Sequence, residues 1–308
     1  MNDTAARRRV PLLGSLRCIG RLTWVELAKL VSHKLFPAAV VLTLVVTAGL
    51  ALAAKSFTES MGSTTRFTNY SLWIVSAGFG LQVGMLLLVA LGAMAMSAEA
   101  TGRTLNTVLA RPIRRIEFAV AKVLSLVFAT AAVVLAAALA AFVVGGTVED
   151  HRPRMAWGGD LDGGGRSGFP SYGDIVDPGS GYVIASRGEV IGHIVRGFAL
   201  MIAPALAAVC IGFLIGTLID SSGLAIGLSV GLYVSLEASK FIPLLEEHLG
   251  RWAFNYPLTR ISTLMYDAGK GILPQWHDAY VGVGISGLYI AICLAISLLV
   301  FCRRDITL

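Results

Sequence analysis

Few residues of this sequence have the types and spacing that chemistry requires. The four cysteines lie far apart, so they form neither the close pairs of a zinc site nor a disulfide framework. The patterns His-Glu-x-x-His and Gly-x-Ser-x-Gly are absent, which excludes the commonest zinc and serine hydrolases. A phosphate-binding Gly-x-x-x-x-Gly-Lys-Ser/Thr loop is absent as well, because Gly269-Lys270 is followed by Gly271. We therefore expect no catalytic residue, no cofactor and no metal on this chain.

One stretch does match a catalytic pattern. Glu246-Glu247-His248-Leu249-Gly250-Arg251 fits the Glu-Glu-x-x-x-Arg motif of CAAX-type proteases, which work inside membranes. These enzymes also need Phe-x-x-x-His and His-x-x-x-Asn/Asp elements, and none of the five histidines supplies either. The motif is interpreted as a coincidence on a polar segment.

Composition indicates which elements must position any site. Of the 308 residues, 56% are apolar and 14% are charged, against about 45–50% and 25% in a soluble domain. A membrane-spanning helix needs about 20 mostly apolar residues to cross about 30 Å of hydrocarbon. The apolar residues of each candidate helix occupy all of its faces, whereas the strands of a membrane β-barrel would alternate apolar and polar residues. The sequence thus predicts an all-α polytopic membrane protein with six spans, at 35–54, 71–97, 117–146, 194–218, 222–241 and 279–301.

Charge predicts the orientation of these spans. With both termini in the cytoplasm, the internal segments hold 14 of the 25 Lys and Arg residues, counting Lys122 at the start of the third span. The internal side then carries +8 and the external side −2. Basic residues in short loops remain cytoplasmic, so we expect a multi-pass protein of the bacterial inner membrane. Ala51 and Ala53 also allow cleavage after the first span, but 34 residues precede that span, and retention is favoured.

Two domains follow from this topology. Residues 1–34 form a cytoplasmic N-terminus, in which 12–33 has an apolar arc and is expected to lie along the membrane interface. Residues 35–308 form the six-helix domain, with external loops at 55–70, 147–193 and 242–278. Nine of the 24 residues from Gly158 to Gly181 are glycines, which is typical of a flexible loop.

The cytoplasmic loop 98–116 is the most informative stretch. Thr101 or Thr104 can cap a short helix, in which Leu105, Val108 and Leu109 recur on one face before Pro112 ends it. Charge alone would explain a basic connector between two spans. It does not explain the apolar face, which needs lipid headgroups or a groove in another protein.

At this loop the sequence resembles the ABC type 2 transporter permease family. The family pattern corresponds to residues on both sides of the loop and within it, namely Glu99, Thr104, Leu105, Leu109, Pro112, Arg115 and Lys122. The ending Phe301-Cys302-Arg303-Arg304-Asp305 also looks like the family's closing sequence. The six-span order and the interfacial helix agree with this family.

The resemblance implies a permease subunit, by analogy an exporter, served by a separate ATPase that binds the ATP. Two permease chains, identical or different, would sit on two ATPase subunits within the lipid membrane. The 98–116 helix would couple the two proteins, with the residues Glu99, Thr104, Leu105, Leu109, Pro112 and Arg115 at the contact. A membrane-embedded enzyme and a scaffold without transport remain as alternatives. We expect no nucleic-acid partner, because the basic residues border the spans.

Overall fold

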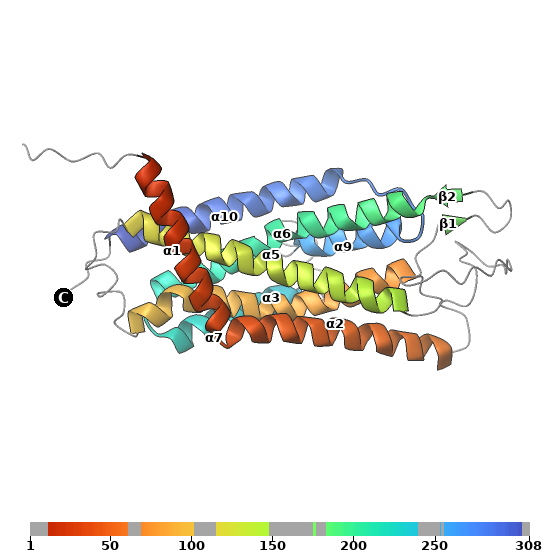
Figure 1. Ribbon diagram of the computed structural model, residues 1–308, viewed down its shortest axis with the longest axis horizontal. Coiled ribbons are helices and arrows are strands. Elements are labelled where there is room, and N and C mark those ends of the chain that lie inside the picture. Colours follow the sequence, from red (N-terminus) through yellow and green to blue (C-terminus); the bar gives the residue numbers. More distant parts are fainter. Residues whose placement is uncertain are drawn as a thin grey trace, which may run out of the picture.

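The fold is an elongated bundle of helices (Figure 1). The computed structural model describes residues 12–60, 69–101, 115–147, 175–176, 183–239, 253 and 256–303. Within these ranges there are eight helices, and six are long and apolar enough to cross a membrane. The all-α polytopic fold expected from the sequence is therefore confirmed.

The helices follow the order of the expected spans. The six spanning helices are α2 (Leu35–Ser60), α3 (Asn69–Thr101), α5 (Arg115–Thr147), α6 (Arg187–Leu218), α7 (Ser222–Ser239) and α10 (His277–Arg303). The two further helices are α1 (Leu12–Ser32), which crosses one end of the bundle, and α9 (Tyr256–Ala268).

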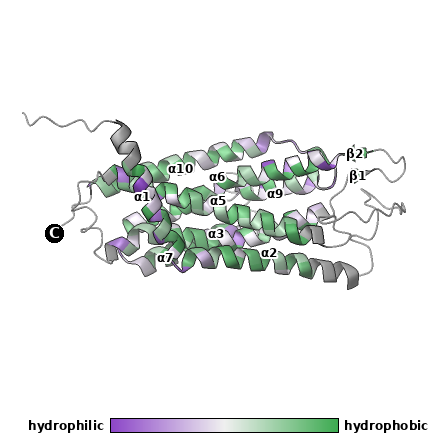
Figure 2. Cartoon of the chain, viewed as in Figure 1, coloured by the Kyte–Doolittle hydropathy of each residue, from purple (hydrophilic) through white to green (hydrophobic). Residues whose placement is uncertain are grey.

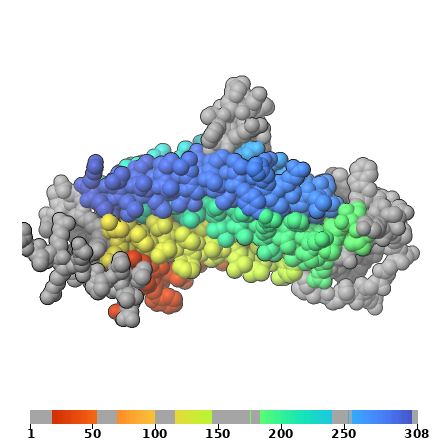
Figure 3. All heavy atoms as spheres, turned by 90° about the horizontal axis from the view of Figure 1, so that it is seen from above, coloured from red at the N-terminus to blue at the C-terminus, as the bar shows by residue number. Residues whose placement is uncertain are grey.

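Helix α3 forms the centre of the bundle, because it packs against α2, α5, α6, α7 and α9. Its large side chains Trp73, Ile74, Met85 and Leu88 are buried. The outer helices turn apolar side chains outward, and Figure 2 shows hydrophobic residues along the bundle with hydrophilic ones gathered towards its two ends. Figure 3 shows α10, α6 and α5 running side by side along one face. This distribution is that of a bundle whose solvent is lipid.

Glycines allow the closest helix contacts. A Cβ added to Gly92 of α3 would lie 2.5 Å from the carbonyl oxygen of Val209 in α6, and one added to Gly212 would meet the backbone of α3 at Val89. The glycines of α7 differ, because Gly223, Gly227 and Gly231 have no atom within 4 Å of any added Cβ.

The segments between the spans differ in part from the expectation. The predicted flexible loop 147–193 contains two short strands, β1 (Ile175–Val176) and β2 (Val183–Ala185), which pair antiparallel. Helix α6 begins at Arg187, before the predicted 194, because Ser186 and Glu189 cap each other's backbone N–H groups.

The predicted external loop 242–278 contains α9, whose apolar face packs against α3, α6 and α10. Trp276, which lies between α9 and α10, is 7% exposed. Its Nε1 donates a hydrogen bond to Nδ1 of His193, at 3.2 Å.

Candidate coupling site

The end of the bundle that α1 crosses carries a buried cluster of charges. Helix α1 packs on α5 and turns Thr23 and Glu26 inward, while Trp24, on its outer side, is 72% exposed. Glu99 lies in the last turns of α3 and Lys122 lies in the second turn of α5. These two residues therefore stand on opposite sides of the segment that joins α3 to α5.

The cluster is a network of two acids and two bases, which we call the ion quartet: Glu26, Lys29, Glu99 and Lys122. Lys122 Nζ lies 2.8 Å from Oε2 of Glu26 and 2.9 Å from Oε1 of Glu99. Lys29 Nζ lies 2.8 Å from Oε1 of Glu26 and 3.4 Å from Oε1 of Glu99. Because two acids face two bases, the quartet carries no net charge and joins α1, α3 and α5.

Burial divides the quartet into a strong and a weak part. The Lys122 side chain is 4% exposed and those of Glu26 and Glu99 are 8% and 12% exposed, whereas that of Lys29 is 52% exposed. Ion pairs that are screened by water contribute little to stability, whereas removing one partner of a buried ion pair lowers stability strongly. Lys122 is therefore the residue on which the contact between the three helices depends most.

The quartet shifts the pKa of both charged groups on α1. Burial of Glu26 acts to raise its pKa, but the charge of Lys122 and the hydrogen bonds from Lys122 and Lys29 outweigh burial and lower it below 4.5. Burial of Lys29 acts to lower its pKa, but the hydrogen bond and charge of Glu26, together with Glu99, raise it above 10.5. Both groups are thus held in their charged forms at neutral pH.

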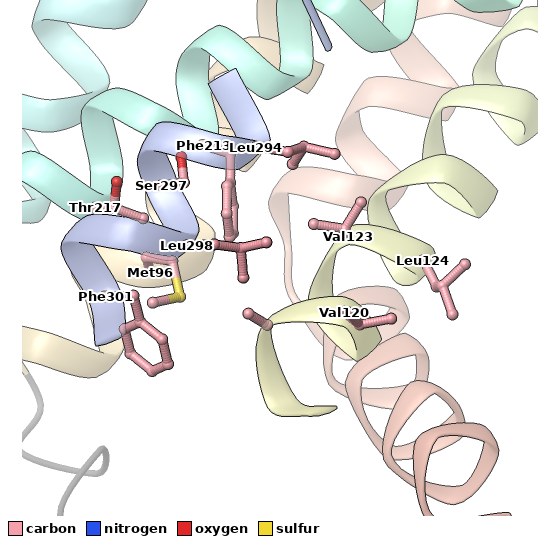
Figure 4. Close-up of a pocket in the computed structure, with 11 residues that line it drawn as sticks. Met96, Val120, Val123, Leu124, Phe213, Thr217, Leu294, Ser297, Leu298 and Phe301 are labelled. Carbon is pink, nitrogen blue, oxygen red and sulfur yellow. The ribbon is translucent and has the colours of Figure 1, made fainter. Parts of the chain in front are cut away.

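Aromatic residues connect the quartet with the C-terminal helix. Lys122 Nζ lies 4.9 Å from the centre of the Phe118 ring, a cation–π distance, and Phe118 lies 6.2 Å from Phe301 of α10. Beside Phe301 is an apolar pocket of about 240 Å³ between α3, α5, α6 and α10 (Figure 4). The pocket wall includes Met96 of α3 and Leu298 of α10.

Few of the predicted coupling residues fall on described positions. Glu99 is in the quartet, and Arg115 is the first residue of α5. The other predicted coupling residues lie outside the described residues, as does most of the expected short helix at 98–116; they are Thr104, Leu105, Leu109 and Pro112. The coupling role of all six residues therefore stays a prediction.

Sequence reasoning missed Glu26, the acid that α1 contributes. A signal was present, since Glu26 lies next to Ile19 at the edge of an otherwise apolar arc. The complementary signal was Lys122, a lone cation at the sixth residue of the predicted third span. A lone acid on an apolar arc and a lone base in a span predict each other as partners.

Other residues noted in the sequence are not brought to this site. Glu237 lies on α7 and lines a separate cavity with Gln82. The protease-like stretch 246–251 lies outside the described residues. In the described ranges no three His, Cys, Asp or Glu side chains group together as metal ligands would.

Comparison with known proteins identifies part of the chain. Residues 22–155 match the family model described as ABC-2 family transporter protein. A search of curated proteins finds no match. The matched region begins within α1 and contains α2, α3 and α5, and so it includes all four residues of the ion quartet. Residues 22–155 are therefore similar to the ABC-2 family of transporter proteins, which confirms the predicted resemblance and supports a permease subunit of an ABC transporter in a membrane.

Proposed function

We propose that the chain is the permease of an ABC exporter and that the ion quartet transmits movement from a separate ATPase to the spanning helices. One observation supports this most: Glu99 and Lys122 stand on the two sides of the α3–α5 connection, and each forms an ion pair with a residue of α1, Glu99 with Lys29 and Lys122 with Glu26. A force on the connection reaches α3 and α5 together, and α1 with them. Short rigid elements that move as units are the usual means of switching an interface between two states.

The proposal includes an orientation. The end of α3, the start of α5, the α6–α7 connection and the end of α10 all lie at the end crossed by α1 (Figure 1). We assign this end to the bacterial cytoplasm, because the short basic segments of the sequence belong to it. In a cysteine-free background, a membrane-impermeant thiol reagent on intact cells should label Val183→Cys and leave Ser221→Cys unlabelled. The reverse pattern would refute the orientation and with it the coupling site.

The ATPase contact is tested at the predicted apolar face of the loop. The chain is co-expressed with a candidate P-loop ATPase, and ATPase co-purification is measured. We expect Leu105→Asp with Leu109→Asp to abolish co-purification without loss of membrane insertion, since charges cannot fill an apolar groove. The matched control is Val183→Asp with Ile184→Asp, two exposed residues of β2, which should leave co-purification unchanged. Unchanged binding by the loop variant would contradict the proposal.

A second permease chain is expected at the open glycine face of α7. Gly227 has free space around it, and its neighbours Leu224 and Leu228 are 68% and 56% exposed. Small residues let two membrane helices approach closely, and we propose a homodimer through this face. Gly227→Cys should form a disulfide-linked dimer on mild oxidation, while Gly284→Cys, on the open side of α10, should not. No cross-link at 227, or equal cross-linking at both positions, would refute this interface.

The export direction rests on the family resemblance. Inverted membrane vesicles test it, because an exporter should take up its cargo into them when ATP is added outside. ATP-dependent release from inverted vesicles would instead indicate import.

A further inference from the structure

A second cavity, with polar walls, lies on the side of the bundle between α3, α7 and α9. Its volume is about 280 Å³, near the lower limit of the 300–1,000 Å³ that is typical of small-molecule sites. Helix α9 closes one side of it by packing against α3 and α6. The cavity shares no residue with the apolar pocket or with the ion quartet.

Polar groups from three helices converge on this cavity. Helix α3 contributes Gln82, α7 contributes Tyr233 and Glu237, and α9 contributes four hydroxyl groups. The hydroxyl residues of α9 are Thr259, Ser262, Thr263 and Tyr266. Among the described lining residues Glu237 is the sole ionisable acid, and none is basic. Lys270 contacts one lining residue, because its Nζ lies 4.1 Å from the centre of the Tyr266 ring.

The cavity lies towards the end of the bundle opposite the ion quartet. Gln82 precedes Glu99 by 17 positions on α3, which is about 25 Å of helix at 1.5 Å per residue. Glu237 belongs to the last turn of α7. An ionisable side chain within a membrane-spanning helix is costly and typically marks a site where something binds or passes.

The lining chemistry selects a class of ligand. One carboxylate balances one positive charge, and the described residues offer no second acid for a divalent metal. Hydroxyl and amide oxygens can accept hydrogen bonds from an ammonium group. The remaining wall is apolar, with Ile74, Leu81 and Met85 among its residues, and the rings of Tyr233 and Tyr266 favour a cation with an aromatic or aliphatic body.

We propose that this cavity binds a small organic cation, a protonated amine with an apolar body, whose ammonium group pairs with Glu237 and hydrogen-bonds to Gln82 and the α9 hydroxyls. The apolar body of the amine lies against α3. This binding does not depend on ATPase coupling, because the cavity is formed within one chain.

The test is calorimetric titration of the full chain in nanodiscs of a zwitterionic lipid, without any ATPase, so that a failure of coupling cannot affect it. The probe is benzylamine, and benzyl alcohol is its neutral counterpart of similar shape. We expect saturable benzylamine binding and much weaker binding of the alcohol. Glu237→Gln keeps the side-chain shape and removes its charge, and it should weaken benzylamine binding by about tenfold or more, as for loss of a charge-assisted hydrogen bond.

Two further variants make the result decisive. Asp220→Asn removes an exposed carboxylate from the α6–α7 connection and should bind benzylamine as the unchanged chain does. Ser262→Leu keeps the charge of Glu237 but fills part of the cavity, and it should also lose binding. Equal binding of the alcohol and the amine would overturn the proposal, as would an equal loss in the Asp220 variant. If the Glu237 variant does not insert, unchanged binding by Ser262→Leu would overturn it.

Discussion

Replacement of Lys122 by Met should loosen the contact between α1 and the spanning helices. Methionine keeps the volume of the side chain and removes its charge, so two buried carboxylates would face only Lys29. Removing one partner of a buried ion pair costs about 3–5 kcal/mol. We expect a value near the lower limit, about 3 kcal/mol, because Lys29 still neutralises part of the charge. The loss would appear as a lower free energy of unfolding in a denaturant titration of the chain in mixed micelles.

A matched variant separates the buried from the exposed base. Lys29→Met removes the same group from the same network, but this side chain is 52% exposed, so the cost should be about 0–1 kcal/mol. Combining Lys122→Met with Glu26→Gln and Glu99→Gln should restore most of the lost stability, because no unpaired charge then remains buried. The reasoning is refuted if Lys122→Met costs no more than Lys29→Met, or if the triple variant is no more stable than the single one.

Four further outcomes follow from the structure. The pKa of Glu26 is lowered, so its stabilising contribution is complete above pH 4.5 and is lost as the pH falls through the folded-state value. Below pH 4.5 the unchanged chain should therefore lose stability more steeply than Glu26→Gln. Thermal unfolding at several pH values measures this difference. The pKa of Lys29 is raised, so its contribution is complete below pH 10.5 and is lost as the pH rises beyond it; stability of Lys29→Met should therefore change less above pH 10.5. Gly92→Ala should destabilise the chain by about 1–3 kcal/mol, because its Cβ would lie 2.5 Å from a carbonyl oxygen of α6. Gly49→Ala has open space around it and should stabilise α2 by up to about 1 kcal/mol. The same denaturant titration compares the two variants, and equal effects would contradict the close packing at Gly92. Ser186→Ala should cost about 1 kcal/mol by removing the cap of α6, and Ser186→Thr should restore most of it; no difference between these two variants would show that the cap contributes nothing.

The sequence predicts the spans well because a bilayer imposes one simple rule on them. Apolar length alone locates a helix that must cross about 30 Å, and all six predicted spans correspond to helices. The ends were less predictable, since they depend on local polar contacts. Helix α6 starts at Arg187 because of the Ser186–Glu189 capping box, which apolar length does not reveal.

Helix α9 and the ion quartet required the tertiary structure. The 13 residues of α9 are too few and too polar to be recognised as a span, and they are helical because α3, α6 and α10 cover their apolar face. The family pattern singled out Glu99 and Lys122, but it did not indicate Glu26, which lies 96 positions from Lys122. Contacts over such separations are determined by how helices cross, and hydropathy carries no information about crossing.

The electrical neutrality of the ion quartet has a consequence for how the permease responds to voltage. A single charge moved through the membrane field gains or loses about 2.3 kcal/mol for each 100 mV. Two acids and two bases that move as one body gain nothing, because their contributions cancel. The quartet itself therefore adds no voltage dependence to a movement of α1 with α3 and α5.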